Sequence, residues 1–499
     1  MKASKTQVLV AGGGPAGSVA ASILAREGVK VTLVERLKHP RYHIGESLLT
    51  SVMPIFEFID VRDEVERHGF KKKYGGYFRV KQGERPGHIT FAKLSRYDHS
   101  FQVLRSEFDE LLFDHARKSG AETMEETAVT AVDFENGRPV AADLSMPDGS
   151  TQKLAFDYMV DATGLSGLLS THYFNNRREE PAFANVAVGT YYFGARPYRN
   201  PQGEEEPGAF SMEALTDGSG WTWAIPLHTG ELSVGVVLHR DVYRERFKQL
   251  GSNEAVFEAT MKSSPDVTAL VETATRGDDI RVWRDYSYFA REYAGPGYRL
   301  AGDAAGFIDP LFSTGVHMAF LGALSAAATI CSEMHGEAKA AELERFHHRC
   351  LSMAYTRLAV TVAGFYRQLH NQQEIVLPGI THENFQSAFD FIQPVVSGNV
   401  DLNSGDITED ALERAMHYTT DMMLEVHQLE TNNKVAKMMA SAAMDDLTGM
   451  RALDAIDGLY IRMKRGQLGI ARSGAVQSAA AGVRRRVIKG VVAGSQSRN

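Results

Sequence analysis

The sequence predicts an α/β fold, α+β overall, in which a Rossmann-type dinucleotide-binding domain is joined to an antiparallel sheet and a helical region. Two observations predict this class. A β-branched run near the N-terminus ends in three consecutive glycines, and the middle of the chain alternates apolar and polar residues with many aromatics. We expect a dinucleotide-binding domain over 1–180, completed by 290–335, a substrate-binding sheet over 181–289, and C-terminal helices over 336–499 that cover the substrate pocket.

The N-terminal glycines form the first binding motif. Gly12 to Gly17 matches GxGxxG, preceded by a strand over 7–11 and followed by a helix from Ala16 and a second strand that ends in Glu35. Gly12 permits the tight turn, Gly14 lets a pyrophosphate approach the backbone, and Gly17 permits close packing of helix on strand. The helix N-terminus at Ala16 offers N–H groups to phosphates, and Glu35 can accept hydrogen bonds from ribose hydroxyls.

The bulk composition excludes several classes of partner. The net charge of −8 provides no basic surface for nucleic acid or anionic lipid. We expect no membrane span, because the richest apolar run, Met318–Ile330, is shorter than the ~18 uncharged residues that a span needs. Two cysteines, Cys331 and Cys350, are too few for a disulfide scaffold, which favours a reducing, cytoplasmic compartment. The basic cluster at 484–489 is interpreted as part of a solvated tail, and no metal is expected.

Two later motifs favour FAD over NAD. Asp161 to Gly164 follows a short strand, and Gly302-Asp303 follows another strand far downstream. With the glycine motif, this trio resembles the flavoprotein monooxygenase superfamily. The resemblance implies that Asp303 contacts the ribityl chain of FAD and that Arg105 lies near the pyrophosphate, although an ordinary surface arginine is the alternative. A capping box formed by Ser106 and Asp109 is expected to open the helix after Arg105.

Three further segments resemble the signatures of flavin-dependent halogenases, in the same order along the chain. They are the lysine segment Phe70–Phe78, which contains Lys73, the WxWxIP segment Trp221–Pro226, and the F-x-x-P-x-x-S-x-G segment Phe307–Gly315. The sequence is most similar to those of the free-standing phenol halogenases of fungal type. Each segment also has an ordinary interpretation: a solvated lysine run, tryptophans packed in a core, and a helix N-cap at Ser313.

The resemblance implies an FADH2-dependent halogenase that uses O2 and chloride or bromide. Ser313, Thr314 and Gly315 would bind the halide at a helix N-terminus. A wall formed by Trp221, Trp223 and Pro226 would separate flavin from substrate, so that hypohalous acid is the electrophile. Lys73 would hold or trap this electrophile and deliver it to the ring, and burial would favour the neutral amine that a chloramine requires.

Two residues bear on the substrate. In tryptophan halogenases a glutamate that takes the substrate proton stands at the position of Phe312. Phe312 cannot act as a base, so we expect a self-activating phenolic ring. Asp457 is a candidate for orienting the phenol hydroxyl, against the interpretation that it is a surface aspartate.

Other functions stay open at this point. No second nucleotide motif is found, so a separate NAD(P)H-dependent flavin reductase is the expected partner. The alternative enzyme is an aromatic hydroxylase of the same superfamily that uses NAD(P)H directly. A geranylgeranyl-reductase-like enzyme shares the FAD motifs but lacks the Lys73 segment, and a flavin-binding protein without turnover would have no use for that segment.

Overall fold

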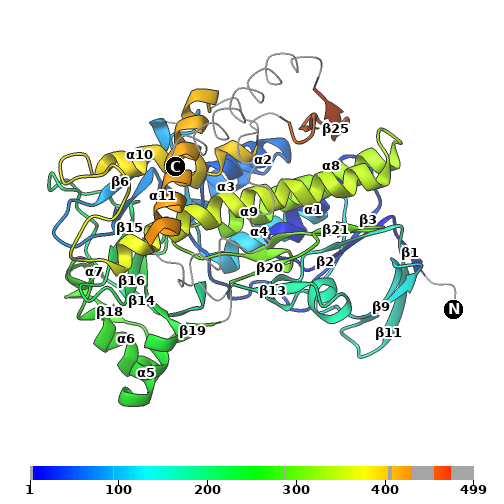
Figure 1. Cartoon of the computed structure of the whole chain (residues 1–499). Coiled ribbons are helices and arrows are strands. Elements are labelled where there is room, and N and C mark those ends of the chain that lie inside the picture. The colour runs from blue at the N-terminus through cyan, green and yellow to red at the C-terminus, as the bar shows by residue number, and fades with distance from the viewer. Residues whose placement is uncertain are drawn as a thin grey trace, which may run out of the picture.

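The computed structural model describes the chain from Ser4 to Ser473 apart from residue 94 and residues 181–182, 285–286, 403–406 and 430–454. The predicted basic cluster and tail lie outside these described residues. Figure 1 shows two long helices that cross the middle of the molecule, with one large sheet at one end and a small sheet at the other.

A six-stranded sheet forms the centre of the predicted dinucleotide-binding region. Its order is β21-β22-β12-β2-β3-β8, and it is parallel except for β21. All residues of β2, β3, β12 and β22 are buried, the pattern of a parallel sheet covered on both faces. The strands are Val8–Ala11 (β2), Val31–Val34 (β3), Glu122–Met124 (β8), Tyr158–Asp161 (β12), Ala294–Gly295 (β21) and Tyr298–Leu300 (β22).

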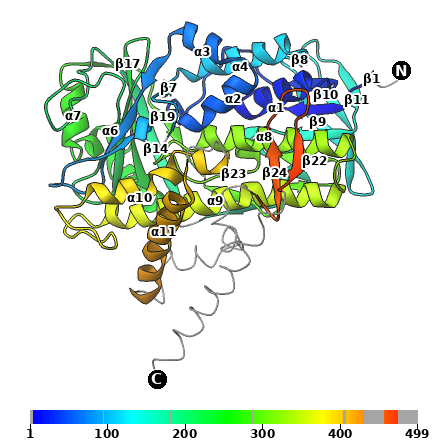
Figure 2. The same ribbon diagram turned by 90° about the horizontal axis from the view of Figure 1, so that it is seen from above.

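Helix α8 is the most deeply enclosed of the long helices. It spans Gly315–Met334 and packs against α1 (Pro15–Arg26) and α9 (Ala340–His370), as Figure 2 shows. The prediction that the apolar run is too short for a membrane span is wrong, because α8 has 20 residues and a mean hydropathy of 1.5 over its most apolar window. That window is 94% buried inside the protein, and the core helix of a soluble protein has the same length and composition.

The predicted capping box is also wrong. Helix α4 spans Arg105–Lys118, so Ser106 lies within the first turn, and the N-cap residue Leu104 has no capping side chain. Asp109 is fully buried and accepts hydrogen bonds from Arg105 instead of closing the helix end. Ser106 and Asp109 have the spacing of a capping box, but the Asp109 carboxylate forms a buried ion pair with Arg105.

The second sheet has the order β18-β14-β17-β16-β15-β5-β6, with β19 beside β14. The antiparallel pairing of β14 to β17 is as predicted, whereas β5 and β6 join from the N-terminal region and β15 pairs with β5 in parallel. The strands are Gly75–Arg79 (β5), Gly87–Thr90 (β6), Asn185–Phe193 (β14), Phe210–Ala214 (β15), Gly220–Pro226 (β16), Glu231–His239 (β17), Thr275–Arg276 (β18) and Arg281–Trp283 (β19).

Three helices interrupt the region that was predicted to be sheet alone. They are Arg240–Leu250 (α5), Asn253–Met261 (α6) and Pro265–Val271 (α7). Val256, Phe257 and Val267 from these helices form a core cluster with Val234 and Val236 of β17. The helices therefore cover one face of the sheet, whereas Trp221 and Trp223 belong to the main core cluster.

The C-terminal region is helical only in part. Helices α10 (Gln386–Val396) and α11 (Glu409–Leu429) follow α9, and a hairpin of β24 (Leu459–Arg462) and β25 (Gly469–Arg472) then packs against α8. The sequence pattern did not predict this hairpin.

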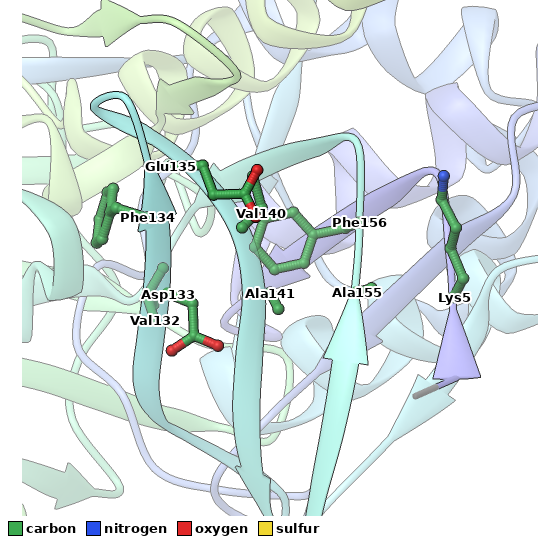
Figure 3. A pocket seen from close by; sticks show the side chains of 9 residues that line it. All are labelled: Lys5, Val132, Asp133, Phe134, Glu135, Val140, Ala141, Ala155 and Phe156. Atoms are coloured by element: carbon green, nitrogen blue, oxygen red, sulfur yellow. The ribbon is translucent and has the colours of Figure 1, made fainter. Parts of the chain in front are cut away.

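A small outer sheet has the order β1-β11-β10-β9, and its predicted turns at Asn136-Gly137 and Asp148-Gly149 are confirmed. It carries an open hollow of about 750 Å³, which Figure 3 shows and which contains none of the predicted site residues. The strands are Ser4–Lys5 (β1), Ala128–Glu135 (β9), Arg138–Ser145 (β10) and Thr151–Ala155 (β11).

The remaining elements are short. They are the helices Met53–Phe58 (α2) and Arg62–His68 (α3), the paired strands Lys71–Lys73 (β4) and Ser100–Gln102 (β7), and a three-stranded sheet of Arg177–Glu179 (β13), Tyr288–Ala290 (β20) and Gly306–Phe307 (β23).

Candidate active site

Of the three glycines of the GxGxxG motif, the first and last are required by the protein's own packing and the middle one is left open. Gly12 has φ +105°, and a Cβ there would lie 2.2 Å from the carbonyl oxygen of Ala162. A Cβ on Gly17 would lie 1.8 Å from the carbonyl oxygen of Gly12. At Gly14 the nearest atom is Nη2 of Arg41, at 3.5 Å. The space above Gly14 is therefore a cradle, as close approach of a pyrophosphate requires.

Glu35 closes the other side of this loop. Its buried carboxylate accepts hydrogen bonds from the N–H groups of Gly13 (2.8 Å) and Leu37 (2.9 Å), at the end of β3. Ala16 lies in the first turn of α1, and a Cβ on Gly302 would lie 2.9 Å from that of Ala16. The first and last of the predicted FAD motifs therefore meet at the N-terminus of α1.

A buried cluster of charges lies beside the loop. Arg105 donates to both oxygens of Asp109, at 2.8 and 3.0 Å, and to the carbonyl oxygen of Ile44. Arg41 donates to Asp109 at 2.9 Å. Burial raises the pKa of Asp109, but Arg105 outweighs it, so the pKa stays below its ordinary value. Sequence reasoning missed Arg41, which belongs to no motif and reaches the cradle only through the tertiary fold.

The middle and late motifs have different roles in the structure. Asp161 is buried, and its carboxylate accepts from the N–H groups of Thr163 and Leu169, so it holds the turn that includes Gly164. Asp303 is half-buried, and burial raises its pKa to about 6 against the influence of Arg105.

Two buried polar atoms of one β-bridge have no partner among the described residues. They are Oε1 of Gln102 and Oγ of Ser47, whose backbones pair in that bridge. Ser47 lies two residues after Gly45, which packs against Arg105. Leaving a buried polar group unpaired costs about 1–3 kcal/mol. The cradle above Gly14 and these unpaired atoms fit a bound cofactor that supplies polar groups, as FAD does.

Of the three consecutive lysines, only Lys73 is buried, with 4% of its surface exposed. Lys72 is exposed and pairs with Glu66. The Nζ of Lys73 donates to the carbonyl oxygen of Leu48 at 3.2 Å and lies over the ring of Phe91, at 5.2 Å from its centroid. With no carboxylate to offset burial, the pKa of Lys73 falls to about 7.

A chain of aromatic contacts leads from Lys73 to the predicted halide segment. Nζ of Lys73 lies 5.6 Å from the ring centroid of Phe210. The ring of Phe78 lies 5.3 Å from that of Phe210 and 5.4 Å from that of Phe312. Phe312, 2% exposed, also contacts Phe365 at 5.3 Å. The fold thus brings the lysine and the halide segment to one apolar region.

The predicted halide segment forms the turn into α8. Ser313 adopts φ +60°, and its N–H donates to the carbonyl oxygen of Pro310. Thr314 is the N-cap residue, and the first intrahelical bond joins the N–H of Met318 to the carbonyl oxygen of Thr314. The amides between them, from Gly315 onward, have no intrahelical acceptor and lie at the positive end of the helix dipole. These N–H groups suit an anion.

The two tryptophans lie on one face of β16, with ring centroids 6.3 Å apart, and Pro226 ends the strand. Trp223 pairs in register with Gly235, which pairs with Gly189. A Cβ on Gly235 would lie 2.1 Å from the Trp223 indole. The two glycines therefore make room for the ring, and the tryptophans form a packed wall.

Known proteins match this chain over most of its length. The FAD binding domain family matches residues 5–360. The sulochrin halogenase gedL of Aspergillus terreus is 37% identical over 94% of this chain and 94% of its own. The flavin-dependent halogenase armH1 of Armillaria mellea is 37% identical over 94% of this chain and 99% of its own. The chain belongs to the flavin-dependent halogenase family.

Solved structures agree with this assignment. The myxobacterial chondrochloren halogenase CndH has a TM-score of 0.67 and 28% identity, covering 84% of this chain and 97% of its own. The flavin-dependent brominase Bmp2, at 22% identity, shares the fold with a TM-score of 0.73, covering 86% of this chain and 100% of its own. The protein is an oxidoreductase that uses FAD and a halide co-substrate, acts on a small molecule and needs a supply of reduced flavin.

The structure places Asp457 at the surface. Its side chain is 61% exposed and forms an ion pair with Arg349. The role of Asp457 toward a phenol hydroxyl stays a prediction.

One group of metal-ligating side chains is present among the described residues, outside this site. Nε2 of His68 and Nε2 of His228 lie 2.7 and 3.1 Å from one carboxylate oxygen of Glu107, and the three ligand atoms lie within 4.8 Å of one another. The sequence did not reveal this group, and the expectation that the halogenase needs no metal stays a prediction.

We expect Gly14→Val to fold but to lose FAD, because its branched side chain would occupy the cradle. Gly17→Ala is the contrasting variant: its Cβ meets the carbonyl oxygen of Gly12, so the flavin-free protein itself should be destabilised, by more than ~1 kcal/mol. Flavin absorbance per protein and thermal unfolding of both apoproteins measure the two effects. A Gly14→Val protein with full flavin occupancy would contradict the cradle.

We expect Lys73→Met to stabilise the protein in a pH-dependent way. Folding lowers the pKa of Lys73 from 10.5 to about 7, so the buried ammonium costs stability below pH 7, and this cost fades toward pH 10. The gain should be on the order of 4 kcal/mol at low pH. Urea unfolding at pH 6 and pH 9 measures it, with exposed Lys72→Met as the control. An equal gain at both pH values would contradict the assignment.

Proposed function

We propose that this halogenase chlorinates or brominates an electron-rich phenolic aromatic through hypohalous acid, with Lys73 carrying the electrophile. The observation that carries the proposal is the enclosure of Lys73, which is buried among phenylalanines without a carboxylate partner. A lysine needed only for solubility would be exposed, as Lys72 is.

The reaction divides between cofactor and protein. Bound reduced FAD supplies the activation of O2. The amides at the start of α8, after Thr314, would hold a desolvated halide in line for oxidation. Trp221 and Trp223 would keep the aromatic substrate away from the flavin, so that oxygen is not inserted directly. Burial lowers the pKa of Lys73 to about 7, which favours the neutral amine, and this form can bond to the oxidised halogen.

The apolar region argues for a substrate that needs little help from the protein. Phe312 provides no base, its neighbours Phe78 and Phe365 are apolar, and Phe389 packs against Phe78 in turn. A phenol activates its own ring, and the halogenated carbon loses its proton readily once aromaticity can be restored. The protein then supplies positioning and containment of the electrophile.

Reduced flavin must come from elsewhere. We propose a separate NAD(P)H-dependent flavin reductase as the source, because the sequence carries one dinucleotide motif, in the FAD-binding part. A cytoplasmic location would give access to this reductase. An aromatic hydroxylase that uses NAD(P)H directly is the competing activity, and it would yield product without halide.

We expect Lys73→Ala to retain FAD and to lose more than ~90% of halogenation, a barrier increase above ~1.4 kcal/mol. Halide incorporation is read by mass spectrometry with chemically supplied FADH2 and a phenol. Lys72→Ala is the matched control, since Lys72 is exposed, and it should keep full activity. Retention of more than ~10% of activity in Lys73→Ala would refute the role of the lysine.

We expect a resorcinol-type ring to be halogenated faster than a simple phenol, and its methyl ether to be turned over slowly. Charge donated by the hydroxyl oxygen activates the ring carbons ortho and para to it. Free tryptophan should be a poor substrate, because Phe312 provides no base. The four compounds are compared at equal concentration with chloride and with bromide. Efficient turnover of free tryptophan, or equal rates for the resorcinol-type ring and its methyl ether, would refute the phenol proposal.

A further inference from the structure

Both tryptophans of the wall end on the same kind of support. Each indole N–H donates to a buried hydroxyl: Trp221 donates to Tyr366, which is bonded to the buried carboxylate of Asp309, and Trp223 donates to Ser233. We propose that Tyr366, Asp309 and Ser233 are positioning residues that hold the two indoles, and that Asp309, acting through Tyr366, fixes Trp221 to the halide segment. This inference rests on the proposed function for its chemical consequence, although not for the contacts themselves.

The Tyr366 hydroxyl, which supports Trp221, uses all of its hydrogen-bonding capacity. Nε1 of Trp221 donates to the Tyr366 hydroxyl at 2.8 Å, and Tyr366 donates to Oδ2 of Asp309 at 2.9 Å. Nδ2 of Asn185 donates to the Tyr366 hydroxyl at 2.8 Å and to Oδ2 of Asp309 at 2.9 Å. The Tyr366 hydroxyl thus accepts two bonds and donates one. Oδ1 of Asp309 accepts from the N–H of Leu311, at 3.0 Å.

The support of Trp223 is a single buried hydroxyl. Nε1 of Trp223 donates to Oγ of Ser233 at 3.2 Å. Ser233 is 3% exposed. A buried hydroxyl therefore holds each indole, and in the support of Trp221 a carboxylate holds that hydroxyl in turn.

The carboxylate of Asp309 is costly to keep in the core. Asp309 forms no ion pair with any described residue, and burial raises its pKa to about 6. Removing a carboxylate from water without a counter-ion is unfavourable, whereas hydrogen bonds to an ionised acceptor are roughly twice as strong as neutral ones. A packed wall needs no such group for stability, so its presence points to a demand for fixed geometry.

The position of Asp309 in the chain shows what Trp221 is tied to. Asp309 lies four residues before Ser313, inside the segment that forms the halide turn. The Tyr366–Asp309 support therefore ties Trp221 to the halide segment. The wall and the halide segment are held in one hydrogen-bonded frame.

Loosening this frame should misdirect the electrophile more than it unfolds the protein. A displacement of ~1 Å in an active site can cost ~10²-fold in rate. Reduced flavin and O2 that do not yield halogenated product give oxidised flavin and hydrogen peroxide, so two electrons are still consumed. The signature of a loose wall is peroxide formed in place of product.

The decisive variant is Tyr366→Phe, which removes one hydroxyl and keeps the ring. Tyr355→Phe is the matched control, because Tyr355 is buried on the same helix α9 and its hydroxyl donates to the carbonyl oxygen of Gly306 instead. Near-ultraviolet circular dichroism reports the coupling of the two indoles, and peroxide per O2 consumed reports the chemistry. We expect Tyr366→Phe to reduce the indole signal and to raise peroxide several-fold relative to Tyr355→Phe.

Ser233→Ala tests the second support and should act in the same direction through Trp223. Equal circular dichroism and equal peroxide yield for Tyr366→Phe and Tyr355→Phe would overturn the inference. If no variant, nor the unaltered protein, halogenates any phenol, the proposed function fails, yet the circular dichroism of the same proteins still decides whether Tyr366 and Ser233 position the indoles.

Discussion

The burial of α8 is the constraint on which the rest of the structure depends. A 20-residue apolar helix that is 94% buried in its most apolar window must be covered along its whole length. α1 and α9 pack against it, and the β24–β25 hairpin packs near its C-terminal end. This packing holds the amides of its first turn, which have no intrahelical acceptor, next to the aromatic contacts that lead to Lys73.

The site accepts costs that a core selected for stability alone would avoid. Lys73, Asp309 and Glu46 are buried, and none of them forms an ion pair with another described residue. Each shifted pKa has burial as its main cause. Around them the protein places phenylalanines and glycines, which exclude water and make room for indole rings. Stability is given up where the chemistry needs a dry and rigid enclosure.

Some predictions failed because tertiary contacts outweighed the preferences of the local sequence. Asp109 has the spacing of a capping residue, but it pairs with Arg105 in the core. The stretch after β17 was predicted to be sheet, yet α5 to α7 form there because their apolar residues cover the sheet face.

The sequence by itself determined the features that depend on neighbouring residues. These are the strand, glycine turn and helix of the FAD motif, the turn into α8, and the alternation that places two tryptophans on one strand face. Spacing that resembles a halogenase motif also selected Lys73 from three lysines, and Lys73 is the buried one.

Only the tertiary structure decided which polar atoms meet. Trp221 and Tyr366 are 145 residues apart and Asp309 and Tyr366 are 57 apart, and Arg41 reaches the cradle from outside any motif. No local period encodes such contacts, because they exist only once the large sheet, α8 and α9 have packed against one another.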